Sequence, residues 1–286
     1  MPRIAYVNGR YLSHRDAFVH VEDRGYQFAD GVYEVCEVAR GYIVDMGPHL
    51  DRLDRSLKEL SIAWPVSRKA LTIIMREVVR HNRVIDGLVY LQVTRGVASR
   101  DFVFPANAKP SLVVLARKAD PGFQARRATT GIKVITVPEN RWERVDIKSV
   151  GLLPNVLAKQ KAKEAGCQEA WFVDTDGMVK EGGSSNAWIV TRDGVLVTRP
   201  ADHGILRGIT RTTLFKVASR LGLKIEERPF AVEEAMRARE AFISSATTIV
   251  LPVVEIDGRP IANGEPGSVA LSLREAFFDV AEKSRA

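Results

Sequence analysis

Cysteine and long apolar runs are the two features that this chain has least of. Its 286 residues include 2 cysteines, Cys36 and Cys167, which are too few for a disulfide framework and lack the CxxC spacing of a zinc site. The N-terminus has no apolar signal core, and no apolar run reaches the length that crosses a membrane. The sequence therefore predicts a cytoplasmic protein with no membrane contact and no bound metal.

Common catalytic motifs are missing as well. The chain contains no G-x-S-x-G elbow, H-E-x-x-H pair, P-loop or G-x-G-x-x-G turn, and these are the usual sequence signs of hydrolases, zinc proteases and nucleotide-binding folds. The 5 histidines are scattered along the chain. Hydrolase triads and zinc chemistry therefore have little support.

A concentrated patch of positive charge is also lacking, although the chain is basic. The formal net charge is +7 and the pI is about 9.5, values that could suit nucleic acid or anionic substrates. Lysine and arginine are interleaved with acids, however, and the densest pair is Arg126-Arg127. We expect no nucleic-acid partner. A basic nucleic-acid-binding protein is the non-enzymatic alternative, and it predicts salt-dependent retention on a polyanion column.

The rest of the composition is that of an ordinary globular protein, with 45% hydrophobic and 27% charged residues. Strand-like and helix-like segments alternate, which predicts an α/β (α+β) fold in two domains. We expect an N-terminal α+β domain over residues 1–118, a linker over 119–131 and a second domain over 132–286. Local signals include an Asn8-Gly9 hairpin turn, a Ser67 helix cap and a terminal helix over Ser268–Lys283.

One lysine has an unusual setting. Lys148 lies between Ile147 and Ser149, and apolar residues follow it. An apolar environment would disfavour the charged ammonium and leave a nucleophilic amine. The alternative is a lysine that extends its head group to water from the edge of a strand. These residues alone favour that alternative.

Three further stretches could bind an anion. Leu206–Thr210 leads into a helix, whose first backbone amides and dipole suit phosphate. Lys180–Asn186 is rich in glycine and serine, and it contains Glu181. Ser244–Thr248 places a run of hydroxyls after an apolar strand. Taken alone, the first stretch is equally well explained as a glycine loop with a capping threonine, and the other two are better explained as ordinary turns.

Taken together, these motifs resemble the class IV aminotransferases, the fold-type IV pyridoxal-phosphate enzymes, and in particular their D-amino-acid aminotransferase members. The resemblance covers nearly the whole chain and includes the motif Asp146–Ser149, which contains Lys148. The matching stretches are Glu22–Phe28, Asp30–Glu34, His49–Leu53, Gln92–Gly96, Asp146–Ser149, Asn155–Gln160, Ser184–Asn186 and Gly208–Arg211. The resemblance implies a two-domain fold with pyridoxal 5'-phosphate in the cleft between the domains, and a homodimer.

The resemblance also implies roles for individual residues. Lys148 would form the Schiff base with the cofactor and shuttle the proton. Glu181 would pair with the pyridine nitrogen, and Arg141 matches an arginine near the phenolic oxygen. Leu206 would pack under the ring. The residues implied to hold the phosphate are Arg52, Gly208, Ile209, Thr210, Ser245, Ala246 and Thr247.

The substrate site departs from the family pattern. Tyr33 and Arg100 match two of three residues that bind the substrate α-carboxylate, but Phe102 stands where the pattern has a histidine, so a hydrogen-bond donor is lost. In the hydroxyl run expected to bind the phosphate, Ala246 stands where the pattern has a threonine, so one possible phosphate contact is lost. The implied reaction is transamination from a D-amino acid to a 2-oxo acid such as pyruvate or 2-oxoglutarate. Branched-chain L-amino-acid transaminase, (R)-amine transaminase and aminodeoxychorismate lyase remain alternatives.

Overall fold

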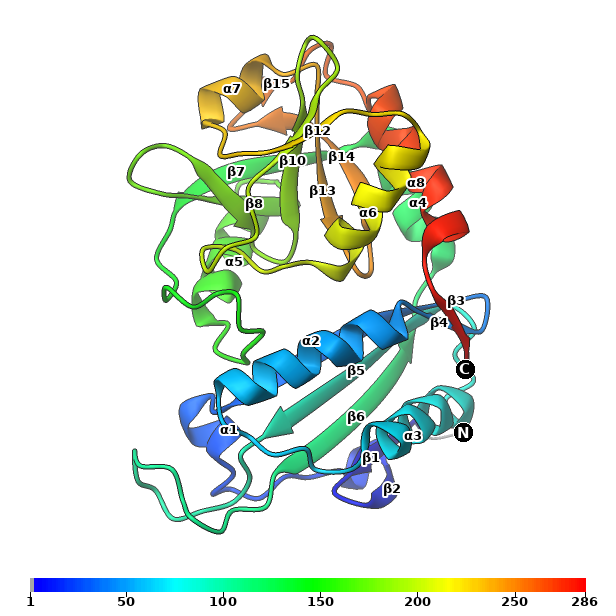
Figure 1. The fold of residues 1–286 in the computed structure, drawn as a ribbon, viewed down its shortest axis with the longest axis vertical. Helices are drawn as coiled ribbons and strands as arrows, with labels where there is room; N and C mark the ends of the chain where they lie inside the picture. The colour runs from blue at the N-terminus through cyan, green and yellow to red at the C-terminus, as the bar shows by residue number, and fades with distance from the viewer. Residues whose placement is uncertain (1–2) are drawn as a thin grey trace. The chain divides into compact units, whose positions relative to one another are not determined.

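The computed structural model describes residues 3–286, which divide into two compact units of mixed α/β structure (Figure 1). Among the described residues, unit 1 comprises 3–120, Ile147–Gly151 and Glu282–Ala286, and unit 2 comprises Pro121–Asp146 and Leu152–Ala281. The chain therefore passes between the units more than once. In the described part, no helix is long and apolar enough to cross a membrane.

Unit 1 is built on a seven-stranded sheet in the order β16-β4-β3-β5-β6-β1-β2. Its strands are β1 (Ile4–Val7), β2 (Arg10–Ser13), β3 (Gly31–Ala39), β4 (Tyr42–Val44), β5 (Gly87–Thr94), β6 (Ser111–Lys118) and β16 (Lys283–Arg285). The predicted Asn8-Gly9 turn is present, and both residues have positive φ, as a two-residue hairpin requires. The C-terminal strand β16 pairs with β4.

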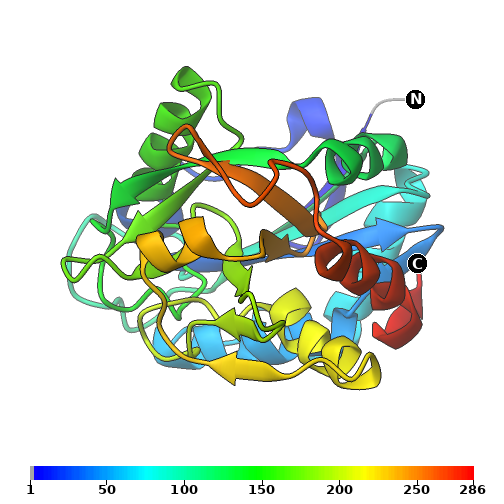
Figure 2. The same cartoon turned by 90° about the horizontal axis from the view of Figure 1, so that it is seen from above.

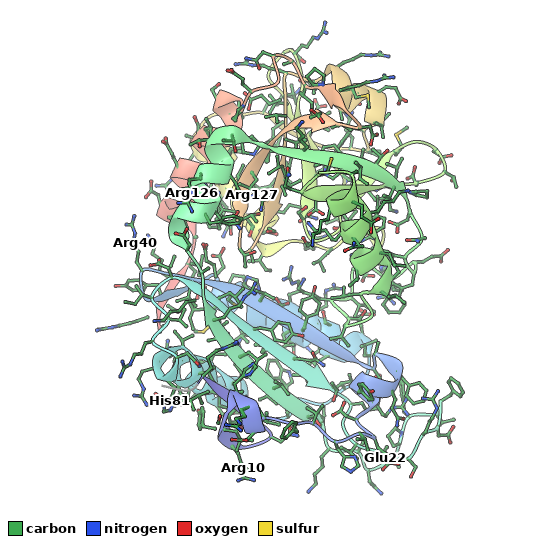
Figure 3. The ribbon with its side chains drawn as sticks, turned by 180° about the vertical axis from the view of Figure 1, so that it is seen from behind. Arg10, Glu22, Arg40, His81, Arg126 and Arg127 are labelled. Atoms are coloured by element: carbon green, nitrogen blue, oxygen red, sulfur yellow. The ribbon has the colours of Figure 1, made fainter. Side chains whose placement is uncertain are left out.

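Two helices of unit 1 bury one face of this sheet. After the single-turn η1 (His14–Asp16) come α1 (Arg24–Phe28), α2 (Met46–Glu59) and α3 (Arg68–His81). Leucines of α2 and α3 form one core with alternate residues of β3 and β5, and Figure 1 shows both helices lying across the strands. Ser67 caps α3, as predicted, by accepting from the Ala70 amide. Figure 3 marks the β1–β2 hairpin with Arg10 and the end of α3 with His81.

Unit 2 is built on a nine-stranded mixed sheet in the order β12-β11-β10-β13-β14-β7-β8-β9, with β15 paired to β14. Its strands are β7 (Ile132–Pro138), β8 (Glu169–Val173), β9 (Val179–Gly182), β10 (Asn186–Val190), β11 (Leu196–Thr198), β12 (Ile225–Glu227), β13 (Glu240–Ser245), β14 (Ile249–Ile256) and β15 (Arg259–Pro260). Most residues of β10, β13 and β14 are buried. Such continuous burial is typical of strands covered on both faces.

The helices of unit 2 are α4 (Pro121–Thr130), α5 (Leu153–Glu164), α6 (Ile209–Arg220), α7 (Val232–Arg237) and α8 (Ser268–Val280). Helix α5 packs against β8, and α6 packs against α8 (Figure 2). Two boundaries differ from the sequence expectations. The expected linker over 119–131 is occupied by α4, which carries Arg126 and Arg127 (Figure 3), and the terminal helix ends at Val280, before β16.

Candidate functional site

The segment that carries Lys148 belongs to unit 1, although the chain on both sides of it belongs to unit 2. Backbone bonds attach it to the start of β3: the Tyr33 amide donates to the Lys148 carbonyl at 3.0 Å, and the Val150 amide donates to the Gly31 carbonyl at 3.0 Å. Ile147 is buried in the core of unit 1. These contacts fix the position of Lys148 on the sheet of unit 1.

The Lys148 side chain is directed onto an aromatic ring. Its Nζ lies 4.3 Å from the centre of the Tyr33 ring, and this ring is itself stacked on Tyr90 at 5.7 Å between centroids. The side chain of Lys148 is half-buried rather than fully solvated. A cation over the face of a tyrosine is favourable, so the structure brings together the predicted Schiff-base lysine and a predicted substrate residue.

A buried ion cluster holds Arg52 on the facing helix. Glu34 of β3 accepts from the Arg52 Nε at 2.8 Å and from an Arg52 terminal nitrogen at 2.7 Å, and the His49 Nδ1 lies 2.7 Å from the same carboxylate. Burial alone would raise the pKa of Glu34, but the Arg52 charge and the two hydrogen-bonding partners outweigh it and lower the pKa to about 2. Burial lowers the pKa of His49 and so favours the neutral ring. The guanidinium of Arg52 is thus fixed in place.

Arg100 and Phe102 lie on the loop that follows β5, beside α1. The Arg100 guanidinium lies 4.5 Å from the centre of the Phe28 ring, and the Phe28 and Phe102 rings are 5.4 Å apart. Phe102 is 83% exposed. The structure therefore places Tyr33 with Lys148 on the sheet, and the other two predicted substrate residues together on an exposed loop.

Glu181 is the centre of the site residues in unit 2. Its carboxylate is buried, and three groups donate to it: Arg141 at 2.6 Å on Oε1, and the Asn186 amide side chain and the Leu206 backbone amide, each at 3.1 Å on Oε2. Leu206 and Arg141 are thereby placed next to Glu181. The guanidinium of Arg141 also binds Glu139.

Asn186 is a residue whose role the sequence analysis missed. Its Nδ2 donates to Glu181 and also to the Leu206 carbonyl at 2.9 Å, while its Oδ1 would lie 2.1 Å from a Cβ built on Gly208. A glycine at 208 is therefore what allows the helix to approach Asn186 so closely. The signals in the sequence were the matching stretch Ser184–Asn186 and the position of Asn186 at the end of a small polar run that leads into an apolar strand.

The expected phosphate-binding residues adjoin this asparagine. Gly208 is the N-cap of α6 and no side chain caps the helix, so the first amides of α6 are available to an anion. Strand pairing places Asn186 opposite Ser244, directly before Ser245, which ends β13, and the turn that contains Ala246 and Thr247. Across that turn Ser245 Oγ and Thr248 Oγ1 are 2.8 Å apart.

The turn after Ser245 has a conformation that needs support. Ile249 is β-branched and has a φ of +57°, which is unfavourable for such a residue. Arg274 of α8 donates to the Thr248 and Val250 carbonyls on either side of it, at 2.5 and 2.7 Å. Arg274 therefore stabilises the backbone of the hydroxyl-bearing turn. Within residues 3–286, no group of three His, Cys, Asp or Glu residues is arranged to bind a metal.

Comparison with known proteins places this arrangement in a family. The model of the family described as amino-transferase class IV matches residues 31–256. The chain is 38% identical over 274 residues to a D-alanine aminotransferase of Listeria monocytogenes, covering 96% of this chain and 94% of the relative. It is 39% identical over 270 residues to the D-alanine aminotransferase of Bacillus licheniformis, covering 94% of each.

Solved structures agree on the fold. The Escherichia coli branched-chain amino acid aminotransferase superposes with a TM-score of 0.90 at 25% identity and covers 98% of this chain and 95% of its own. A second branched-chain amino acid aminotransferase, from T.th. and solved with pyridoxamine 5'-phosphate, also gives 0.90, at 26% identity, with 98% and 94% covered. The expected fold and the expected enzyme class are confirmed, and the chain belongs to the class IV aminotransferases.

Proposed function

We propose that the protein is a pyridoxal-phosphate-dependent transaminase that takes an amino group from a D-amino acid and gives it to a 2-oxo acid by a ping-pong mechanism. The observation that carries this proposal is the Lys148 amine, fixed by backbone bonds to β3 and held 4.3 Å from the Tyr33 ring centre. The choice of a D-amino acid follows the relatives of 38 and 39% identity rather than the branched-chain enzymes of 25 and 26% identity.

The residues present fit the cofactor chemically. Gly208 has no Cβ, so the start of α6 can approach Asn186 closely, and the uncapped N-terminus of α6 suits a phosphate. Ile209 and Thr210, with Ser245, Ala246 and Thr247, would complete the phosphate site of unit 2, and the Leu206 side chain would lie against the ring. Arg52 of unit 1 stays a proposed phosphate ligand on the resemblance alone. When bound, the cofactor supplies an electron sink for the charge that develops at the substrate Cα.

The protein groups then have distinct tasks. Lys148 would hold the cofactor covalently and move the proton between the substrate Cα and the cofactor. Glu181 is a buried carboxylate of the right charge to keep a proton on the ring nitrogen. Tyr33 lies next to the lysine, which is the position needed to orient a small substrate beside the reacting amine.

The substrate carboxylate would be bound by Tyr33 and by Arg100, since a guanidinium binds a carboxylate through two hydrogen bonds. Phe102 cannot donate a hydrogen bond, so this site is expected to bind the carboxylate less tightly than one that contains a histidine there. That expectation leaves room for an (R)-amine donor, which has no carboxylate. The Michaelis constants for the two donor classes would distinguish these substrates.

We further propose a homodimer. Large apolar side chains are exposed on two adjoining segments of unit 1, and they include Phe18, Val21, Tyr26, Phe102 and Val103. The two segments are joined by a hydrogen bond from the Arg24 amide to the Gly96 carbonyl at 2.9 Å and by the bridge between Asp23 and Val97. Contiguous exposed apolar surface of this kind marks an interface. A second copy of the chain would cover it and would receive Arg100 and Phe102 from this loop.

A half-reaction tests the proposal directly. The purified protein is expected to carry a visible band of the bound cofactor, and D-alanine alone should convert that band to the band of the aminated cofactor, whereas L-leucine should not. Lys148→Ala should lose both the band and turnover. Conversion only by L-leucine or by an (R)-amine would keep the family but overturn the substrate. Full activity of the Lys148→Ala variant would overturn the mechanism.

The oligomeric state is tested separately by sedimentation. We expect a dimer for the wild-type protein and a shift towards monomer for Phe102→Asp with Val103→Asp, because two charges would be buried in the apolar contact. A variant with Tyr42→Asp, at a half-exposed position on β4 outside the patch, is the matched control. A monomeric wild-type protein would contradict the dimer.

A further inference from the structure

Arg141 lies between two carboxylates of unit 2. It bonds to Glu139 through Nε at 2.9 Å and through a terminal nitrogen at 2.6 Å, and its other terminal nitrogen bonds to Glu181 at 2.6 Å. The guanidinium also lies 4.3 Å from the centre of the Phe172 ring. With a carboxylate on two of its edges and a ring on its face, Arg141 has one position available to it.

The cluster of Arg141, Glu139 and Glu181 is buried, and its three side chains have a formal net charge of −1. The side chains of Arg141, Glu139 and Glu181 are 5, 17 and 6% exposed, so water screens them little. Burial alone would raise the pKa of Glu139, but the hydrogen bond and charge of Arg141, together with the charge of Lys180, outweigh it and lower the pKa. The pKa of Arg141 is raised, because its acidic partners outweigh its burial. Counted formally, the two carboxylates and the guanidinium carry one negative charge among these three side chains, and Lys180 lies outside this count.

The second carboxylate affects how much of the negative charge of Glu181 is neutralised by Arg141. A guanidinium with a single carboxylate partner forms a neutral pair. Its positive charge then cancels the attraction of that carboxylate for a second cationic group. Because Glu139 takes two of the hydrogen bonds of Arg141, Glu181 shares this arginine with a second acid. It consequently keeps part of its negative charge for a third group.

We propose that Glu139 is a positioning residue that acts through Arg141, leaving Glu181 with enough negative charge to hold a proton on the pyridine nitrogen of the bound cofactor. This inference rests on the proposed function, because it assumes that the cofactor ring is bound beside Glu181. It gives Arg141 a task other than contact with the phenolic oxygen. In this role Glu139 would touch neither the substrate nor the reacting atoms and would act through its hydrogen bonds with Arg141.

The test is the protonation of the ring nitrogen, read by nitrogen NMR on protein loaded with 15N-labelled pyridoxal phosphate. Glu139→Gln keeps the shape of the side chain and removes its charge. The neutral form of the ring nitrogen should become more populated, and the cofactor dissociation constant should rise about tenfold, because a charge-assisted contact is lost. Glu139→Asp should recover part of both effects, since the charge returns on a shorter side chain.

Two controls separate this effect from general damage. Glu143→Gln removes the same charge from an exposed position on the same loop, and it should change neither quantity. In an Arg141→Met background, Glu139→Gln should have no further effect, because the residue acts only through Arg141. Melting temperatures establish whether each variant is folded. If Glu139→Gln does not fold, the same two quantities are measured on Glu139→Asp.

The outcomes are distinct from those of the proposed function. A wild-type protein that binds no pyridoxal phosphate would remove the proposed function. A wild-type protein that binds it, with the ring nitrogen equally protonated in Glu139→Gln and Glu139→Asp, would remove this inference alone. An effect of Glu139→Gln that persists in the Arg141→Met background would also overturn it.

Discussion

Each unit of the molecule holds one of the predicted cofactor-binding arginines in a buried acidic cluster, and the two clusters differ in formal charge. In unit 1, Glu34 uses both oxygens on Arg52, and with a neutral His49 the cluster is uncharged overall. In unit 2, Glu139 and Glu181 share Arg141, so one negative charge remains. The first arrangement fixes a cation in position. The second leaves a charge that can act on a bound group.

The largest loss of stability should follow the removal of Glu34, the one carboxylate of the Arg52 cluster. Glu34→Ala leaves Arg52 buried without its carboxylate, which we expect to lower the free energy of unfolding by about 3–5 kcal/mol. Urea denaturation measures it. As a control, Glu77→Ala removes an acid from the exposed pair with Arg80, 2.6 Å apart, and should change little. Equal effects of the two substitutions would mean that burial of the Glu34 cluster does not matter.

Acid should act on the same cluster. The folded pKa of Glu34, about 2, lies below its ordinary value of 4.5, so its contribution is complete above pH 4.5 and is lost as the pH falls towards 2. The difference corresponds to about 3 kcal/mol. His49 adds a loss that begins below its ordinary pKa of 6.5, because burial disfavours its protonation. The wild-type protein should lose stability below pH 4.5 more steeply than Glu34→Gln; parallel curves would contradict this.

Elements that depend on neighbouring residues could be predicted from the sequence, and elements that depend on distant contacts could not. Local signals worked: Asn8-Gly9 makes the hairpin and Ser67 caps α3, because each depends on neighbouring residues. The sequence did not indicate the helix α4 within the expected linker, for a physical reason. Pro121 is acceptable at the first position of a helix, and the helix is stabilised by Ala128, which is buried in the core of unit 2, a contact that the sequence does not display.

The residues of the candidate site also fall into those that short motifs indicate and those that only the fold reveals. The resemblance supplied residue types such as Lys148 and Glu181, because they occur in short motifs. It did not supply their partners. Glu139 precedes Glu181 by 42 positions, and strand β16 pairs with β4 across the length of the chain. Such pairings depend on the tertiary fold, which local patterns do not encode.

A smaller effect is expected where the backbone of unit 2 approaches its acidic cluster. Gly208→Ala would place a Cβ 2.1 Å from Asn186 Oδ1, and Asn186 is held by two hydrogen bonds, so the helix must move. We expect the dissociation constant of pyridoxal phosphate to rise about tenfold, with little change for pyridoxal, which lacks the phosphate. In Gly151→Ala the nearest atom is 3.5 Å away, and no change is expected. Equal losses for both ligands would mean that the helix terminus does not bind phosphate.

The smallest effect belongs to the exposed loop of unit 1, which lies outside both clusters. Phe102→His restores a side chain that can donate a hydrogen bond to a carboxylate, and such a charged hydrogen bond should lower the Michaelis constant for D-amino acids by up to about tenfold. The constant for an (R)-amine should not fall, because that donor has no carboxylate. Val103→His, at the neighbouring exposed position, is the control. A fall for both donor classes would show that the histidine acts on something other than the carboxylate, and no fall for either would mean that the carboxylate is bound elsewhere.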